Sequence, residues 1–347
     1  MYLMSKDTVI AEINFDTGLY KVIRPDLLPL DLRGDNIPIF NIPLWFNDRV
    51  LSISRSNAKV ILDSVKLEQN DRIKICLACR ALSLDDCYWL KFDNDTLTWK
   101  DVNLYHNSLS NGVAKVALTG KWVSLQGKIV TPELTGLGSF AKCWRRFNNQ
   151  LYLYKSGSNN GLNNEAKIEV LVSDILDVLN VEHVKYTLTE LDGRVVSKCK
   201  CLTDENISMT DMLSFSNYCG RNNINIQQWL LKQQLYYEMI VIDYLVLNTD
   251  RHLGNWGVLF DANTGKVLRL RPLFDHNLAF NKYGDINSKV IHGKTLQDAA
   301  HMAKLRCNLD YNKLYKFVKA RKQRFKKIFN SEEEYNDTLK RIKEFLS

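Results

Sequence analysis

The residues whose types and spacing suit catalysis lie in one stretch near the middle of the second half of the chain. A polar run, Asn248-Thr249-Asp250-Arg251-His252-Leu253-Gly254-Asn255, follows a strongly apolar segment. Two short apolar segments within residues 256–270 flank a turn-forming stretch, which predicts a β-hairpin that ends just before Asp275. Because a hairpin returns the chain to its start, we expect Asn255 and Asp275 to be neighbours, with Asp250 one loop away.

Two carboxylates and an amide that converge in this way suit a magnesium site, since Mg²⁺ prefers oxygen ligands and completes its shell with water and substrate phosphates. Phosphoryl transfer needs a metal on the phosphates, a cation that bridges them, and a carboxylate that faces the attacking hydroxyl. Asp250 is the candidate for that carboxylate, and Asn255 and Asp275 are the candidate metal ligands. In the alternative interpretation, Asp250 and Asn255 merely cap a helix end and a turn, which does not explain why Asp275 returns to the same place.

The spacing D-x-x-x-x-N, with an Asp about 20 residues later, is typical of the catalytic loop and metal-binding Asp of the protein-kinase-like fold. In these residues the sequence resembles the HipA-type kinases, the toxin components of bacterial toxin–antitoxin pairs and their relatives. Phosphoinositide kinases share an Asp-Arg-His-x-x-Asn loop, but the upstream layout favours the HipA type. The resemblance covers roughly residues 130 to 330, and the matching residues are Asn248 to Asn255, Pro272-Leu273-Phe274-Asp275, Tyr152-Leu153-Tyr154-Lys155, Asn164-Glu165 and Tyr186.

The resemblance implies roles for residues upstream of the catalytic loop. Lys155 matches the strand lysine that contacts the nucleotide phosphates, although a lysine that ends a strand is also an ordinary surface residue. Glu165, which opens the following helix, matches its carboxylate partner, and Glu169 is the rival for that role.

The resemblance also implies a loop that covers the phosphates. The segment from Gly136 to Lys142 is in its position, and Gly136, Gly138 and Ser139 are expected to approach the nucleotide, because glycine lets backbone N–H groups come close to an anion. By analogy with family members that modify a serine in this loop, Ser139 is a candidate for autophosphorylation.

Several further residues are expected to support the site. His252 in the catalytic loop is expected to brace it rather than to react, and Arg251 is expected to neutralise Asp250 or contact a phosphate. Asp243 lies in a segment that reads as a buried helix, so it must be hydrogen-bonded or paired, and we expect it to anchor the loop. Cys201, with Cys199, lies near the expected nucleotide hinge.

These patterns predict an α+β, protein-kinase-like (HipA-like) fold with two lobes. Four of six prolines fall in the first 45 residues, which indicates extended chain, and residues 1–128 form an N-terminal accessory α/β domain. Residues 129–205 form the kinase N-lobe, with an amphipathic helix that buries Ile168 to Leu179 and a hairpin over residues 184–200. Residues 206–347 form a helical (all-α) C-lobe that carries the catalytic and metal-binding loops, with one buried helix over residues 227–247.

The composition of the chain excludes several other classes of protein. The chain has 347 residues, of which 45% are hydrophobic and 25% charged, which is incompatible with a disordered protein. Eight cysteines are too few for a disulfide scaffold, and Cys76, Cys79 and Cys87 read as buried thiols rather than a zinc site. No segment reads as a membrane span or a signal peptide, so we expect a cytoplasmic protein.

The net charge is +8, and the excess gathers between Lys313 and Lys327. An apolar stripe through the same segment favours a solvated helix face, and nucleic acid or an acidic partner is the alternative. We expect an ATP- and Mg²⁺-dependent protein serine/threonine kinase, with a protein substrate and a possible antitoxin or DNA-bound partner. The alternatives are a kinase of a lipid or small molecule, and a catalytically weak regulatory or DNA-binding module.

Overall fold

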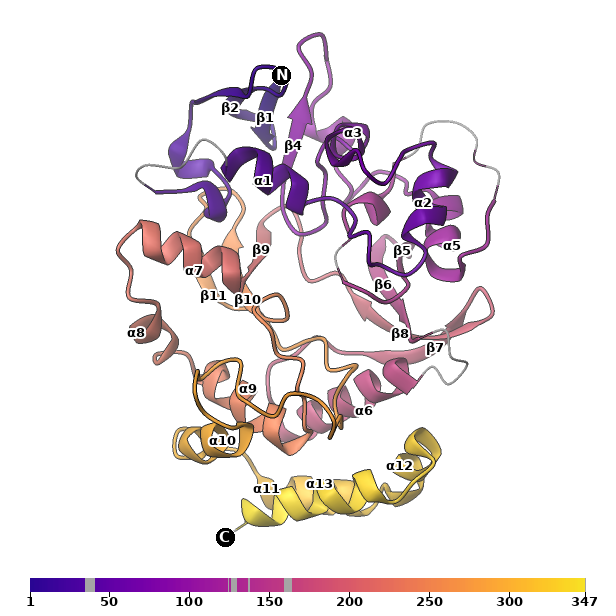
Figure 1. Cartoon of the computed structure of the whole chain (residues 1–347), viewed down its shortest axis with the longest axis vertical. Coiled ribbons are helices and arrows are strands. Elements are labelled where there is room, and N and C mark those ends of the chain that lie inside the picture. The colour runs from indigo at the N-terminus through magenta and orange to yellow at the C-terminus, as the bar shows by residue number, and fades with distance from the viewer. Residues whose placement is uncertain (35–40, 124, 126–129, 137, 159–163, 347) are drawn as a thin grey trace.

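The computed structural model describes residues 1–347 except 35–40, 124, 126–129, 137, 159–163 and 347 (Figure 1). The N-terminal elements lie at one end of the molecule and the last four helices at the other, with a second sheet between them (Figure 1). The predicted boundary at residues 128 and 129 lies outside the described residues, so the domain limits stay a prediction.

The N-terminal part is built on a four-stranded antiparallel sheet of order β3-β2-β1-β4. The expectation of extended chain over the first 45 residues is wrong from Asn41 onward, because α1 begins there. Pro43 lies in the first turn of that helix, where the missing N–H has no partner to lose. The elements are β1 (Tyr2–Ser5), β2 (Thr8–Asn14), β3 (Leu19–Val22), the 3₁₀ helices η1 (Pro25–Leu27) and η2 (Leu30–Leu32), α1 (Asn41–Asp48), α2 (Ala58–Ser64), α3 (Arg72–Ala78), β4 (Tyr88–Lys91), α4 (Trp99–Val102) and α5 (Asn111–Thr119).

The middle part is a second antiparallel sheet, of order β5-β6-β8-β7, against which the amphipathic helix α6 packs. The stripe Ile168, Leu171, Val172, Ile175 and Leu179 of α6 is buried, as the helical periodicity predicts. The predicted hairpin turns at Asp192-Gly193. The elements are η3 (Pro132–Leu134), β5 (Lys142–Phe147), β6 (Gln150–Ser156), α6 (Asn164–Leu179), β7 (Thr187–Leu191) and β8 (Arg194–Lys200).

The C-terminal part is mostly helical, but it is not all-α as expected, because it also contains a three-stranded sheet of order β11-β10-β9. The predicted hairpin forms the β10 and β11 pair, and β9 adds to it from the start of this part. The elements are β9 (Ile207–Asp211), α7 (Met212–Arg221), α8 (Ile226–Leu230), α9 (Gln234–Leu245), β10 (Gly257–Asp261), β11 (Val267–Leu270), α10 (Leu296–Lys304), α11 (Tyr311–Lys319), α12 (Lys322–Phe329) and α13 (Glu333–Glu344).

The prediction of one helix over residues 227–247 is wrong, because the chain breaks between α8 and α9. Trp229 of α8 packs edge-on against Phe215 of α7, with ring centroids 4.8 Å apart, and this contact turns α8 away from the axis of α9. The exposed Leu231 marks the break. Only α9 is buried on nearly every side, so it is the element that carries Asp243 into the interior.

The hydrophobic core joins the three parts. One cluster of buried side chains includes Leu3 of β1, Leu171 of α6 and Phe345 after α13. Within the described part of the chain, the helices are too short or too polar to cross a membrane.

Candidate functional site

The catalytic-loop residues predicted from sequence lie between the end of α9 and the start of β10. The side-chain amide of Asn255 donates to the backbone carbonyl of Asp250 at 2.9 Å and to its Oδ2 at 3.3 Å. Asn255 is buried. The loop therefore holds the side-chain amide of Asn255 and the carboxylate of Asp250 next to each other.

Asp250 is half-buried, and burial raises the pKa of its carboxyl above the ordinary value, with the charge of Asp275 adding to the effect. The hydrogen bond from Asn255 and the positive charge of Arg251 oppose this shift. The guanidinium of Arg251 donates to the carbonyls of both Asn255 and Phe274, so the catalytic loop and the loop of Asp275 lie side by side, as the hairpin prediction requires.

Arg251 connects the catalytic loop to the elements that pack against it. Its guanidinium is buried and forms an ion pair with Asp243 of α9, with Nε and Nη2 each 3.0 Å from a carboxylate oxygen. Nη1 donates to the carbonyls of Asn255 at 2.5 Å and of Phe274 at 3.0 Å, and Nη2 lies 2.9 Å from Nε2 of His276. All five N–H donors of the arginine thus have partners, and the arginine ties α9, the catalytic loop and the loop of Asp275 into one unit.

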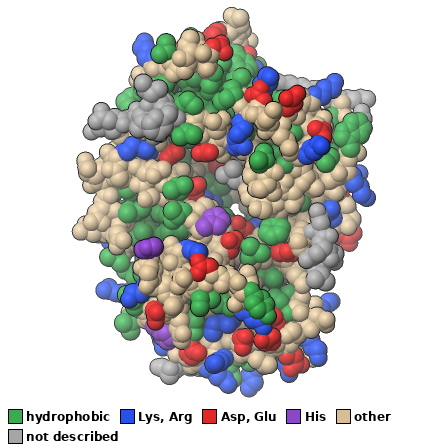
Figure 2. Space-filling view, viewed as in Figure 1, with side chains coloured by type: hydrophobic (Ala, Val, Ile, Leu, Met, Phe, Trp, Pro, Cys, Tyr) green, Lys and Arg blue, Asp and Glu red, His purple; other side chains and the backbone are tan. Residues whose placement is uncertain are grey.

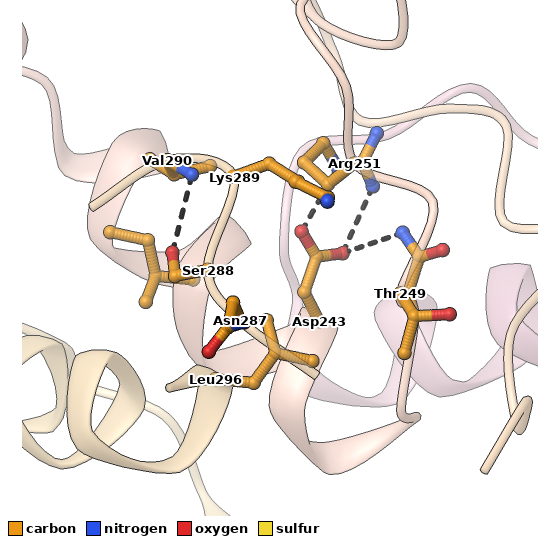
Figure 3. Close-up of a pocket in the computed structure, with 10 residues that line it drawn as sticks. Asp243, Thr249, Arg251, Asn287, Ser288, Lys289, Val290 and Leu296 are labelled. Carbon is orange, nitrogen blue, oxygen red and sulfur yellow. Dashed lines mark hydrogen bonds and ion pairs between the residues drawn. The ribbon is translucent and has the colours of Figure 1, made fainter. Parts of the chain in front are cut away.

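Figure 3 shows this ion pair from the side of a small cavity of about 10 Å³, enough for one water molecule. Asp243 also accepts from the amide of Asn248 at 2.8 Å. Arg251 does not form an ion pair with Asp250, although its charge acts on that carboxyl, because its counter-ion is Asp243. The expectation of a phosphate contact is wrong, because all of its donors already have partners in the protein. The expectation that Asp243 anchors the loop agrees with this geometry.

His252 is exposed, and its Nδ1 accepts a hydrogen bond from the backbone N–H of Gly254 at 3.1 Å. This hydrogen bond stabilises the turn that contains His252, which fits the bracing role expected from the sequence.

Lys155 of β6 joins the middle sheet to the catalytic region. Its ammonium group lies 2.7 Å from Oε1 of Glu169 and 2.6 Å from Oδ1 of Asp275. The other oxygen of Glu169 accepts from the hydroxyl of Ser197 on β8 at 2.6 Å. Lysine, two carboxylates and a hydroxyl therefore form one connected group in which the position of the lysine is fixed.

The pairing of Lys155 with Glu165 is wrong, and its rival Glu169 is the partner. Glu165 lies in the first turn of α6, whereas Glu169 lies one turn further along, where the helix passes over the sheet, and its side chain is 1% exposed. A carboxylate at that depth needs a charged or hydrogen-bonding partner. Oε2 of Glu165 is buried without a hydrogen-bond partner among the described residues.

Asp275 has a left-handed backbone with φ of 61°, a conformation that costs energy in residues other than glycine and is frequent at functional sites. Burial works to raise the pKa of its carboxyl, but the charges of Lys155, Lys142 and Arg251 and the hydrogen bond from Lys155 outweigh burial and lower it to about 2. The carboxylate is therefore ionised throughout the physiological range.

The glycine-bearing segment lies beside this group, apart from residue 137, which is outside the described residues. A Cβ built on Gly138 would lie 2.6 Å from Nζ of Lys142, and Lys142 pairs in register with Lys155 across β5 and β6. Gly138 and Ser139 are exposed, and Gly136 is partly buried. The segment thus leads directly to a second lysine opposite the first.

Lys142 is a site residue that sequence reasoning did not single out. Burial, with the charges of Arg55 and Lys155, lowers the pKa of its ammonium group to about 7, against the pull of Asp275 and Glu133. The hairpin register was the available signal, because a two-residue turn at residues 148 and 149 places position 142 opposite position 155.

Cys201 directly follows β8 and is still hydrogen-bonded to β6. Its backbone N–H donates to the carbonyl of Leu151 at 2.9 Å, and its sulfur lies 3.3 Å from the hydroxyl of Thr203. It packs in a separate hydrophobic cluster with residues of the N-terminal part. The cysteines expected as buried thiols, Cys76, Cys79 and Cys87, are buried and free, and the described residues hold no cluster of three or more His, Cys, Asp or Glu side chains that could bind a metal.

Figure 2 shows acidic, basic and histidine side chains beside a hollow in the middle of the molecule, and a mixture of both charges over the last helices. In the basic segment, Lys322 and Lys326 pair with Glu332, and Arg324 pairs with Asp174 of α6. The mixture favours a solvated helix face for this segment.

Comparisons with known proteins show which sequences and folds this chain resembles. No family model matches the chain. The chain is 26% identical over 152 residues to the serine/threonine-protein kinase CtkA of Helicobacter pylori, a match that covers 37% of this chain and 46% of the relative, less than half of its length.

Two solved structures are similar. The HipA of Shewanella oneidensis MR-1, solved with HipB and its operator DNA, matches with a TM-score of 0.60 and 11% identity over 99% of this chain and 97% of the other. The crystal structure of CtkA matches with a TM-score of 0.43 and 18% identity over 60% of this chain and 88% of the other. The match to HipA shows that the chain has a HipA-like fold, as the resemblance stated from its sequence predicts.

Proposed function

We propose that this protein is an ATP- and Mg²⁺-dependent phosphotransferase that acts on serine or threonine hydroxyls of a protein. The observation that carries the proposal is a set of contacts between three separate elements. Lys155 contacts Asp275, Asn255 contacts Asp250, and Arg251 binds the backbone of both loops. The kinase-like fold and the similarity to a serine/threonine-protein kinase support this class of reaction.

The donor set fits a magnesium ion that is shared with a nucleotide. Asp275 is ionised, and the side-chain amide of Asn255 is fixed by the hydrogen bonds that its NH2 group donates to Asp250, so its amide oxygen is the atom that would serve as the metal ligand. Two protein ligands leave most of an octahedral shell to water and phosphate oxygens, as is usual for Mg²⁺. When bound, the metal would offset negative charge on the phosphates.

The protein's own groups supply the remaining parts. Lys155 is held by Glu169, so its ammonium group can contact phosphate oxygens without first losing rotamer freedom. Asp250 faces the acceptor and takes the proton of the attacking hydroxyl as the new oxygen–phosphorus bond forms and the bond to the leaving phosphate of ADP breaks. Its raised pKa makes it a better proton acceptor than an ordinary aspartate.

The proposed acceptor and the proposed partner both rest on the similarity to CtkA and HipA. Ser139 is exposed on the glycine-bearing segment and is the proposed site of self-modification. The HipA structure contains HipB and operator DNA. By analogy, we propose that this chain also has a protein partner.

The test is transfer of label from γ-labelled ATP in the presence of Mg²⁺. The acceptors are the protein itself, serine/threonine peptides, tyrosine peptides, and a set of lipids and small alcohols. Label on serine or threonine with the wild type, and none with Asp250→Asn, supports the proposal. Label only on lipid or small molecules overturns the acceptor class, and ATP turnover that is equal in wild type and Asp250→Asn overturns the assignment of the site.

A further inference from the structure

A buried arginine of the N-terminal part lies directly beneath the glycine-bearing segment. Arg55, between α1 and α2, is 3% exposed, and its Nη2 lies 2.9 Å from Oε2 of Glu133, whose side chain is 1% exposed. A buried pair of this kind is not explained by stability alone, because desolvation of the two charges offsets much of their attraction.

The same guanidinium holds the backbone at both ends of the segment. Nη2 donates to the carbonyl of Lys142 at 2.6 Å, and Nη1 donates to the carbonyls of Glu133 at 3.2 Å and Gly136 at 3.5 Å. Its partner Glu133 accepts from the backbone N–H of Trp144 at 2.8 Å. Arg55 and Glu133 thus connect the turn before the segment to the first residues of β5.

Backbone contacts follow the same path. The N–H of Ser56 donates to the carbonyl of Ser139 at 2.8 Å, and the N–H of Leu51 donates to the carbonyl of Leu134 at 2.7 Å. The chain on either side of Arg55 therefore runs along the segment, and the guanidinium fills the space below it.

The fit between the segment and the arginine is close. A Cβ built on Gly136 would lie 2.5 Å from Nη1 of Arg55, a distance at which one of the two must move. Glycine at this position therefore permits contact with the guanidinium in addition to any approach to a phosphate.

The segment also ends at the candidate site. Lys142, whose carbonyl Arg55 binds, pairs in register with Lys155, and Lys155 contacts Asp275. A shift at the start of β5 would therefore move the glycine-bearing segment relative to the lysine and the carboxylate.

We propose that Arg55 is a positioning residue that fixes residues 133–136 and 138–142 for nucleotide binding, so that the N-terminal part completes the nucleotide site. This inference rests on the proposed function. A loop held in its bound shape pays less ordering entropy when the ligand arrives, so the contribution of Arg55 lies in the affinity for ATP rather than in the chemical step.

The test compares Arg55→Lys with Arg49→Lys. Arg49 is an equally suitable control, because it forms a buried pair with Asp86 at 2.7 Å and also donates to a backbone carbonyl, that of Ala81, within the N-terminal part. Both substitutions keep the positive charge and remove the planar group that binds several acceptors at once. A second variant, Arg55→Met with Glu133→Gln, removes both charges and leaves no buried charge unpaired.

Two measurements are made on each variant. The first is amide hydrogen exchange of residues 133–142 without nucleotide, which does not depend on the proposed function. The second is the steady-state dependence of phosphotransfer on ATP. We expect Arg55→Lys and the double variant to exchange about tenfold faster in this segment and to raise KM for ATP about tenfold, with kcat within about twofold of wild type, and we expect Arg49→Lys to change neither.

Equal effects of Arg55→Lys and Arg49→Lys on exchange in this segment would overturn the inference, and so would faster exchange with an unchanged KM for ATP. A wild-type protein that neither binds nor consumes ATP would instead overturn the proposed function, and the role of Arg55 in nucleotide binding with it. The two failures are therefore distinguished by the behaviour of the wild type.

Discussion

Nζ of Lys155 lies 2.6 Å from Oδ1 of Asp275, although the two residues are 120 positions apart in the chain. The contact spans the middle sheet and the C-terminal part, since Lys155 ends β6 and Asp275 follows the β10 and β11 hairpin. A cation that bridges phosphates and a carboxylate that holds their metal must be neighbours in a phosphotransferase, and this pair has that relationship.

Glu169 is expected to matter more than Glu165 for phosphotransfer. The change Glu169→Gln removes the charge that orients Lys155, and a misplaced catalytic group costs up to about 10²-fold in rate. We expect kcat/KM for ATP to fall by about 10²-fold in Glu169→Gln and by less than about threefold in Glu165→Gln. Steady-state kinetics of both variants check this, and a larger loss in Glu165→Gln would restore the pairing first read from the sequence.

Removal of one partner of the ion pair between Asp243 and Arg251 is expected to destabilise the folded state strongly. Asp243→Asn leaves the buried guanidinium without its counter-charge, which costs about 3–5 kcal/mol. Denaturant unfolding measures the change.

The matched control is Asp26→Asn. Asp26 also accepts two bonds from one arginine, Arg24, but the side chains are 56% and 47% exposed. An ion pair that is exposed in this way is screened by water and contributes little to stability. Equal losses in the two variants would contradict the view that Arg251 is the internal anchor of the catalytic loop.

The lowered pKa of Lys142 predicts a specific dependence of stability on pH. In the folded protein the group loses its proton near pH 7, whereas in the unfolded chain it keeps it to about 10.5. The unfolded state therefore binds more protons between these values, so this lysine makes stability rise with pH across that window. Below pH 7 the ammonium group is charged in both states, and the cost of burying it is fully present.

Lys142→Met is therefore expected to stabilise the protein more at about pH 6 than at about pH 9.5, when each is compared with wild type by denaturant unfolding. The exposed Lys200 at the end of β8 supplies the control, and Lys200→Met should give the same small offset at both values. A pH-independent offset in Lys142→Met would contradict the assignment of the shift to burial beside Arg55 and Lys155.

The parts of the site that are local in sequence were predictable. Turn residues between two apolar segments define the β10 and β11 hairpin, and the hairpin brings Asp275 back to the loop of Asp250 and Asn255. The helix stripe of α6 and the Asp192-Gly193 turn follow from periodicity and turn chemistry in the same way.

Other parts of the site depend on how deeply a side chain is buried or on residues far away in the chain, and these parts were not predictable from sequence. The choice between Glu165 and Glu169 is decided by which turn of α6 passes over the sheet, and no local pattern states that. The role of Arg55 depends on Glu133 and Lys142, which are 78 and 87 positions away, and the inward direction of Arg251 depends on carbonyls of two separate loops.

The most direct test of the central claim is a calorimetric titration with ATP, with and without Mg²⁺, of the wild type, Asp275→Asn and Asp250→Asn. We predict that Mg²⁺ strengthens ATP binding to the wild type and to Asp250→Asn, and that Asp275→Asn loses this enhancement. ATP binding that ignores Mg²⁺, or that keeps its full dependence on Mg²⁺ in Asp275→Asn, would contradict the assignment of Asp275 to the metal and the account built on it.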